Sequence, residues 1–444
     1  MSGVLARMLG AVVVAFTATV VASDAAAVNV ERVRSPGGLE AWLVQDHQNP
    51  IITVRFAFRG GSALDPVGKE GLAEMVSSLL DEGAGDLDSQ AFNRRLEDMA
   101  ASVRFDAGTD VFGGRLQTLT ESHVPAFDLL RQALTTPRFD DEPVARIRGQ
   151  FLSQLRREAE DASSIGRKAM TKILFPAHPY GRVGTTTPAS LGAITVADLR
   201  RFMGERLARA NLVIGVVGDI RPEALGPLLD STFGGLARDA QPWTLPEATP
   251  AAAGETVVIT KVQPQSNILF AQAGVKRRDS DYYAAEIMNY VLGSGGFTSR
   301  LYAEVREKRG LAYSVSTFLQ PMEYAGLLRG GVGTANARVA ETIDVVRGEW
   351  RRMAESGITA DELNDAKTYL TGSFPLRFAT TENTAAILVA IQLDNLGIDF
   401  IDRRNTFVEA VTLDDVRRAA RKLLDPSKLA VVVVGQPEGM PATR

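Results

Sequence analysis

The sequence contains no cysteine, so disulfide bonds, thiolate zinc sites and thiol catalysis are all excluded. It has only three histidines, His47, His123 and His178, and no two of them have the spacing of metal ligands. Positive charge is not in excess either, because the net charge is −4, and this argues against nucleic acid as the main partner. The 444 residues otherwise have an ordinary globular composition and suffice for two or three domains.

One long apolar run occurs, and it lies at the N-terminus. Arg7 precedes the run 8–22, and the small residues Ala25 and Ala27 fit the exit site of a secretory signal. We therefore expect residues 1–27 to be a signal peptide and the protein to be periplasmic or secreted. A membrane anchor is the alternative, although the run is short for a full span. No later segment is long and apolar enough to cross a bilayer, so we expect no membrane span after signal removal.

Two parts of the chain repeat at a constant spacing. The segment 194–201 (ITVADLRR) resembles 411–418 (VTLDDVRR), and the apolar run 213–218 resembles 430–435, with both pairs 217 residues apart. Chance would not preserve a helix, a connection and a strand at one offset. We therefore expect the chain to contain two copies of one unit.

The repeated unit mixes helices and strands. Thr195 and Thr412 each lie three residues before an aspartate, Asp198 or Asp415, which is a capping-box arrangement at a helix start. The run 51–58 (IITVRFAF) has the period of a strand, with its apolar residues sharing one face. Long helices packed on one face of a mainly antiparallel sheet suit this order, so we expect an α+β fold with two homologous domains.

A proline-rich segment separates the two copies. Residues 239–255 contain prolines at positions 242, 246 and 250 together with several alanines, which is the composition of an extended linker. We therefore place an N-terminal domain at 28–238 and a C-terminal domain at 256–444.

The segment 71–81 (GLAEMVSSLLD) has the apolar spacing of an amphipathic helix. With Gly60-Gly61-Ser62 upstream, it resembles the pitrilysin, or insulinase-like, zinc peptidases, in which Gly-Leu-Ala precedes an inverted zinc motif, His-x-x-Glu-His. The resemblance covers nearly all of the chain after the apolar run. It implies two pitrilysin-type domains arranged like a clam shell.

The zinc motif itself is missing. Glu74 stands at the first zinc histidine, Ser77 at the catalytic glutamate and Ser78 at the second histidine, while the third ligand position falls near Gln154. A serine hydroxyl neither holds zinc nor deprotonates metal-bound water at neutral pH. The resemblance therefore implies no catalytic residue, no metal and no cofactor in this chain. Without the resemblance, a second interpretation of Glu74, Ser77 and Ser78 stays open: they form the solvated face of an ordinary helix.

The second half keeps a segment that the zinc peptidases also have. Residues 291–315 resemble the family's second-domain signature, in which an arginine and a tyrosine help bind substrate at the zinc site of the facing domain. The matching residues are Arg306 and Tyr313. A guanidinium fork suits peptide carbonyls, and a tyrosine hydroxyl can donate to an oxygen that gains negative charge. Without the resemblance, the segment is an ordinary charged helix ended by Gly310, with Tyr313 packed in the next strand.

A glycine-rich turn precedes this segment. Gly293, Gly295 and Gly296 match a region that lies near the substrate chamber in the family. The alternative is a helix C-cap followed by a flexible connection.

The resemblance implies a non-catalytic, substrate-binding subunit of a secreted heteromeric zinc metallopeptidase that hydrolyses peptides. Its partner would be a homologous catalytic subunit that carries His-x-x-Glu-His and the zinc. The alternative is a structural, assembly or peptide-holding protein of the same fold with no proteolytic role.

Overall fold

The computed structural model describes residues 28–251 and 254–443. The predicted signal peptide, residues 1–27, lies outside this range. No helix within the described ranges combines the length and the apolar character that crossing a membrane requires.

The first half of the chain builds a six-stranded sheet in the order β1-β2-β8-β3-β7-β6. Neighbouring strands run antiparallel, except that β2 and β8 run parallel. The strands are β1 (Glu31–Arg34), β2 (Glu40–Gln45), β3 (Ile51–Arg59), β6 (Ser102–Ala107), β7 (Val111–Leu119) and β8 (Leu212–Gly218), with a separate small ladder of β4 (Gly83–Ala84) and β5 (Leu87–Asp88).

The second half builds a five-stranded sheet in the order β11-β12-β10-β13-β9, with only β13 and β9 parallel. This order matches β6-β7-β3-β8-β2 of the first sheet strand for strand, including the place of the parallel pair. The two halves therefore share one topology, as the repeat predicted. The strands are β9 (Thr256–Thr260), β10 (Gln265–Ala273), β11 (Val315–Pro321), β12 (Gly326–Ala335) and β13 (Ala430–Gly435).

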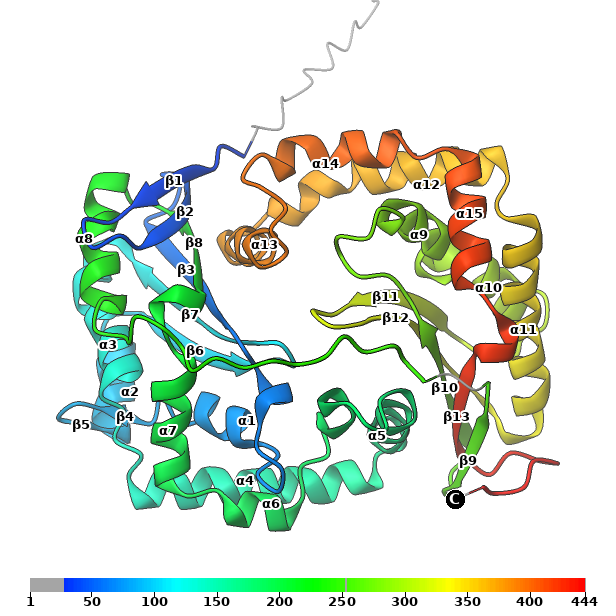
Figure 1. Ribbon diagram of the computed structural model, residues 1–444, viewed down its shortest axis with the longest axis horizontal. Helices are drawn as coiled ribbons and strands as arrows, with labels where there is room; N and C mark the ends of the chain where they lie inside the picture. The colour runs from blue at the N-terminus through cyan, green and yellow to red at the C-terminus, as the bar shows by residue number, and fades with distance from the viewer. Residues whose placement is uncertain (1–27, 252–253, 444) are drawn as a thin grey trace, which may run out of the picture.

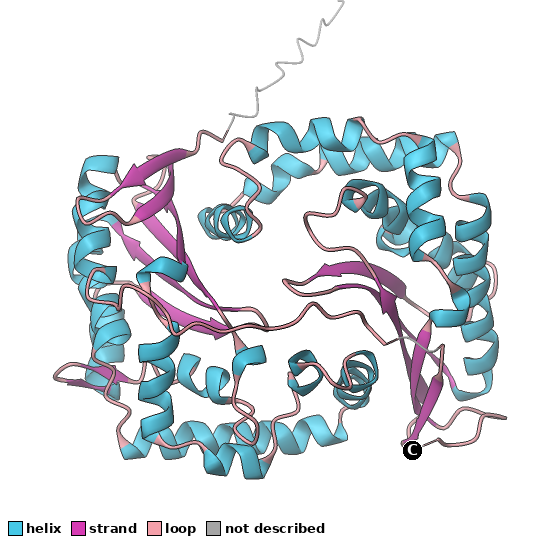
Figure 2. Cartoon of the chain, in the orientation of Figure 1, coloured by secondary structure: helices cyan, strands magenta, loops and turns pink. Residues whose placement is uncertain are grey.

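Helices surround both sheets (Figure 2). In the first half they are α1 (Leu72–Ser77), α2 (Ser89–Asp98), α3 (His123–Thr135), α4 (Asp141–Glu160), α5 (Ala162–Leu174), α6 (Pro188–Ala193), α7 (Val196–Arg206) and α8 (Pro222–Phe233). In the second half they are α9 (Tyr282–Asn289), α10 (Arg300–Tyr302), α11 (Val339–Ser356), α12 (Ala360–Gly372), α13 (Thr381–Leu393), α14 (Phe400–Glu409) and α15 (Leu413–Leu423).

The predicted capping boxes at α7 and α15 are both confirmed. Thr195 accepts from the Asp198 backbone nitrogen at 3.3 Å, and its own nitrogen donates to the Asp198 carboxylate at 2.9 Å. The corresponding distances between Thr412 and Asp415 are 3.1 and 2.9 Å. Such reciprocal bonds satisfy two backbone donors that a helix start would otherwise leave free.

Each sheet is covered on its second face by a helix from the other half. Helix α13 lies against β3 and β8, and α5 lies against β10 and β13, so both helices stand between the two sheets (Figure 1). Leu388 of α13 packs with Trp42 and Val217 of the first sheet, while Met170 of α5 packs with Val432 of the second. We predicted helices on one face of each sheet. This holds for the helices of the same half, but a helix of the other half covers the second face.

This exchange explains the burial pattern of β3. Ile52, Val54 and Phe56 share one face and are fully buried in the core of the first half. Thr53 points to the opposite face and is fully buried too, because α13 covers it. Its hydroxyl lies 2.8 Å from the hydroxyl of Thr381 at the start of α13.

The proline-rich segment between the halves is extended and crosses the middle of the molecule (Figure 1). The backbone nitrogen of Ala248 donates to the carbonyl of Tyr324 at 2.8 Å, and the Pro246 carbonyl lies 3.0 Å from Nε2 of His178. The linker therefore contacts the first half at Pro246 and the second half at Ala248.

Docking of α13 leaves no room for a side chain at Gly215 of β8. A Cβ atom at this position would lie 2.8 Å from the Ala385 carbonyl oxygen and 2.9 Å from Cβ of Leu388. We expect Gly215→Ala to lower the free energy of unfolding by about 1–3 kcal/mol, since it forces α13 away from the sheet. Chemical denaturation measures the change.

The matched control is Gly348→Ala in α11, where a Cβ atom would meet nothing within 4 Å. This substitution should stabilise the chain by about 0.5–1 kcal/mol, because it removes a flexible residue from a helix interior. Equal stability of the two variants would contradict the tight docking of α13.

Candidate functional site

Helix α1 and the residue that follows it, Ser78, carry three of the positions predicted for a degenerate zinc motif. The helix is shorter than the predicted helix 71–81, because regular hydrogen bonding ends at Ser77 and the chain continues in turns that still bury Leu79 and Leu80. Asp65 is buried and accepts from the backbone nitrogens of Gly71 and Ala73 at 3.0 and 3.1 Å, which fixes the start of α1. Burial raises the pKa of Asp65 to about 7, against the opposing effect of these hydrogen bonds.

The four positions predicted for a degenerate zinc motif lie together on one cavity of about 230 Å³. We name it the Glu74 cavity. The residues that line it are Glu74, Ser77, Ser78, Phe151, Gln154, Leu155, Glu158, Gly184 and Thr186. Ser77 is only 8% exposed, so the interpretation of this face as a plain solvated helix surface is wrong.

Two carboxylates line this cavity, and their pKa values shift in opposite directions. Glu158 accepts from Nε2 of Gln154 at 2.8 Å and pairs with Nζ of Lys168 at 2.9 Å. Burial acts to raise the pKa of Glu158, but the hydrogen bonds from Lys168 and Gln154 lower it overall. Burial raises the pKa of Glu74, and the negative charge of Glu158 adds to this effect while Lys168 opposes it.

These residues do not fit a zinc ion. Catalytic zinc in proteins takes imidazole, thiolate or carboxylate ligands, commonly three from one chain. Here Glu158 is already engaged by the Lys168 ammonium, and the Ser77 hydroxyl donates to the Glu74 carbonyl at 2.8 Å. The Lys168 ammonium would repel a divalent cation. The serines at the remaining positions offer hydroxyls, which are poor zinc ligands.

The histidines lie elsewhere, and each has a local partner. Nδ1 of His47 is 2.6 Å from a carboxylate oxygen of Asp219, and His123 contacts the carbonyl of its neighbour Thr120. His178 accepts from the backbone nitrogen of Tyr180 at 3.1 Å and so caps the turn that follows it. Across residues 28–251 and 254–443, no three histidine, aspartate or glutamate side chains are grouped to hold a metal ion.

The predicted Arg306–Tyr313 pair is close in space. The guanidinium carbon of Arg306 lies 4.3 Å from the ring centre of Tyr313, 5.0 Å from that of Tyr302 and 5.9 Å from that of Phe297. Arg306 also donates a hydrogen bond to the hydroxyl of Tyr302. We call these four residues the Arg306 cluster. A cation over aromatic faces in this way is held by the ring quadrupoles.

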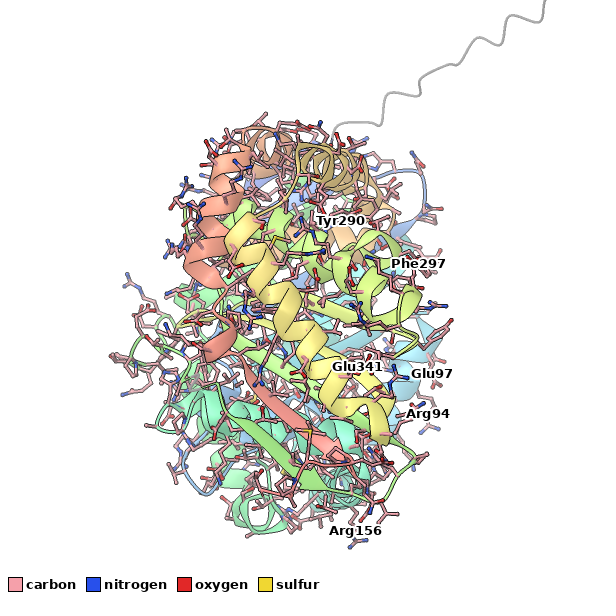
Figure 3. All side chains as sticks on the ribbon, turned by 90° about the vertical axis from the view of Figure 1, so that its right-hand side faces the viewer. Arg94, Glu97, Arg156, Tyr290, Phe297 and Glu341 are labelled. Carbon is pink, nitrogen blue, oxygen red and sulfur yellow. The ribbon has the colours of Figure 1, made fainter. Side chains whose placement is uncertain are left out.

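Tyr313 is 80% exposed and Phe297 is 73% exposed, and Figure 3 shows Phe297 projecting at the edge of the molecule. Tyr313 precedes β11, which starts at Val315, so the alternative in which this tyrosine packs in a strand is wrong. Sequence reasoning missed Phe297 and Tyr302. The only signal for Phe297 was its place directly after the glycine pair.

The glycine-rich turn positions Phe297. A π-helical turn, Tyr290–Ser294, is closed by a hydrogen bond from the Gly295 nitrogen to the Tyr290 carbonyl at 2.9 Å. Gly296 then adopts a φ of +60°, which favours glycine. A Cβ atom at Gly293 would lie 2.5 Å from the Thr317 hydroxyl of β11. The geometry of these glycines is therefore that of a helix end and the connection after it.

The partly buried carboxylate of Glu74 predicts a pH-dependent effect on stability. Because its pKa is raised on folding, the folded chain holds this proton more tightly than the unfolded chain does, and the free energy of unfolding falls as the pH rises above about 4. We expect Glu74→Gln to be more stable than the wild type at pH 7, with the gain fading near pH 4. Urea denaturation at both pH values measures it.

Glu160→Gln is the control, since Glu160 is exposed and paired with Lys261 at 3.0 Å on the surface. Its effect should stay within about 0.5 kcal/mol at either pH. A loss of stability in Glu74→Gln at pH 7 would contradict the assignment of Glu74 as an unfavourably buried charge.

Known proteins resemble the chain in sequence and in structure. Residues 193–370 match a family model described as the peptidase M16 inactive domain, a segment that does not include α1. The non-peptidase homolog YmxG of Helicobacter pylori is 28% identical over 76% of this chain and 78% of its own length. An uncharacterized zinc protease of Streptomyces coelicolor is 27% identical over 93% of this chain and 91% of its own length.

Among solved structures, the crystal structure of a peptidase M16 inactive domain from Pseudomonas fluorescens superimposes with a TM-score of 0.86. It is 27% identical, and the match covers 94% of this chain and 99% of that one. The fold, the duplicated sheets and the matched segment agree with the pitrilysin-like resemblance of the sequence. The chain is therefore similar to the peptidase M16 family, and in particular to proteins described as its inactive domain or as a non-peptidase homolog.

Proposed function

We propose that this chain is the non-catalytic, substrate-binding subunit of a secreted heteromeric zinc peptidase. A homologous partner supplies His-x-x-Glu-His and the zinc. Arg306 and Tyr313 of this chain bind the peptide at the zinc site of that partner. The observation that carries the proposal is the Arg306 cluster, in which an exposed tyrosine is held 4.3 Å from a guanidinium.

The geometry of the cluster suits recognition more than stability. Burial of an aromatic ring stabilises a fold, whereas Phe297 and Tyr313 remain largely exposed and gain little from burial. Tyr302 and the rings fix the direction of the Arg306 guanidinium, so its free N–H groups lose little entropy on binding a carbonyl. The hydroxyl of Tyr313 can donate to an oxygen that becomes negative during hydrolysis.

The side chains that line the Glu74 cavity support the proposal that a partner supplies the metal site. Peptide hydrolysis by this fold requires a metal-bound water and a base, and the serines at these positions supply neither. The apolar run 8–22 supports export, and with it a periplasmic or extracellular site of action.

An assembly or peptide-holding role without proteolysis is the second candidate. The exposed rings of Phe297 and Tyr313 would serve equally to hold an unfolded peptide. The two candidates differ in whether a complex with a motif-bearing homologue hydrolyses peptides.

The test is reconstitution with a homologous exported subunit from the same source that carries His-x-x-Glu-His. We expect the mixture to hydrolyse unfolded peptides that neither chain cleaves alone. Tyr313→Phe should lower kcat by a factor on the order of 10², because it removes a donor to the developing oxyanion. Arg306→Ala should lower kcat/KM mainly by raising KM, because it removes a donor to a peptide carbonyl.

Tyr369→Phe is the matched control, because it removes another exposed tyrosine hydroxyl of the second half and should leave the rate unchanged. Full activity of Arg306→Ala and Tyr313→Phe would overturn their roles. A stable complex without hydrolysis would favour the peptide-holding candidate.

A further inference from the structure

The Glu74 cavity has the size of a single side chain. Its volume of about 230 Å³ is below the range of about 300–1,000 Å³ that encloses whole small-molecule ligands. Phe151 and Leu155 of α4 give it an apolar wall, while Glu74 of α1 and Ser78, directly after α1, give it oxygen atoms. An elongated group with an apolar stem and a polar end matches such a lining.

The charged residues of the cavity indicate whether the polar end of a bound group is positive or negative. Lys168 compensates Glu158 at 2.9 Å, and Gln154 donates to the same carboxylate. Glu74, in contrast, has no ion pair and no side-chain hydrogen bond with any residue in the described part of the chain. Lys168 and Arg167 both act on Glu158 by charge, and Lys168 acts on Glu74 only at longer range, so Glu74 is left as a carboxylate without a direct partner. Placing such a charge in a partly buried position unpaired costs folding free energy.

We infer that the Glu74 cavity binds the basic side chain of a peptide, a lysine or an arginine, with the Glu74 carboxylate as its counter-charge. This inference rests on the proposed substrate-binding function and names the class of peptide. The ammonium or guanidinium donates to Glu74 and to the hydroxyl of Ser78. The methylene stem lies against Phe151 and Leu155, as long cationic side chains do on apolar surfaces.

Other ligand classes match the cavity less well. An acidic side chain would meet the charges of Glu74 and Glu158, and a wholly apolar side chain would leave Glu74 buried and unpaired. A divalent metal would meet the ammonium of Lys168 and hydroxyls in place of imidazoles. A single positive charge on a flexible stem satisfies both the charge and the shape.

The experiment compares two fluorescent, unstructured peptides that differ only in one residue, lysine in one and norleucine in the other. Binding to the full chain is measured by fluorescence anisotropy at 0.15 M salt, where long-range attraction is screened. We expect the lysine peptide to bind about 10-fold more tightly or better, as a hydrogen bond to a charged group allows. Glu74→Gln should remove this difference.

Two controls separate this inference from the proposed function. Glu160→Gln, at an exposed position of the same helix α4, should keep the wild-type preference. Arg306→Ala should weaken both peptides alike and leave their ratio unchanged. Thermal unfolding of each variant checks that the fold is intact.

Equal binding of the two peptides to the wild type, or no binding of either, would overturn the inference, as would a preference that survives Glu74→Gln. Equal binding that Arg306→Ala abolishes would leave the proposed function standing without the basic-side-chain pocket. A lysine preference that needs Glu74, found together with no partner-dependent hydrolysis, would support the pocket and refute the peptidase role.

Discussion

The reciprocal docking of α5 and α13 is the contact on which the rest of the structure depends. Each helix covers the sheet of the other half, so the second face of each sheet is buried only when both halves are in place. The end of α13 is held further by Arg59, which donates to the Leu393 carbonyl at 2.6 Å. Two halves that are joined in this way behave as one body, although the chain looks like two domains in sequence.

The same docking links the two candidate sites. Helix α5 packs on the second sheet through Met170 and Gly166, and it also supplies Lys168, which neutralises Glu158 in the Glu74 cavity. The charge balance of a cavity in the first half thus depends on a helix anchored in the second.

The sequence predicted what local chemistry and repetition encode. Spacing in the sequence predicted the helix caps at Thr195 and Thr412 and the duplicated α+β unit. The resemblance predicted that Gln154 lies near Glu74. The helix exchange could not be predicted, because the apolar face of α5 or α13 has the same pattern whichever sheet it covers. The sequence predicted only two members of the Arg306 cluster, Arg306 and Tyr313. π-helical turns bring the other rings close, and such turns leave no periodic pattern of residues in the sequence.

Zinc binding by the isolated protein tests whether this chain has the pitrilysin-like frame without its metal chemistry. The purified chain is dialysed with equimolar zinc, separated from free metal, and analysed by mass spectrometry for zinc per chain and for hydrolysis of an unfolded peptide. We expect far less than one zinc per chain and no hydrolysis. One tightly held zinc per chain, with peptide cleavage that a chelator stops, would contradict it.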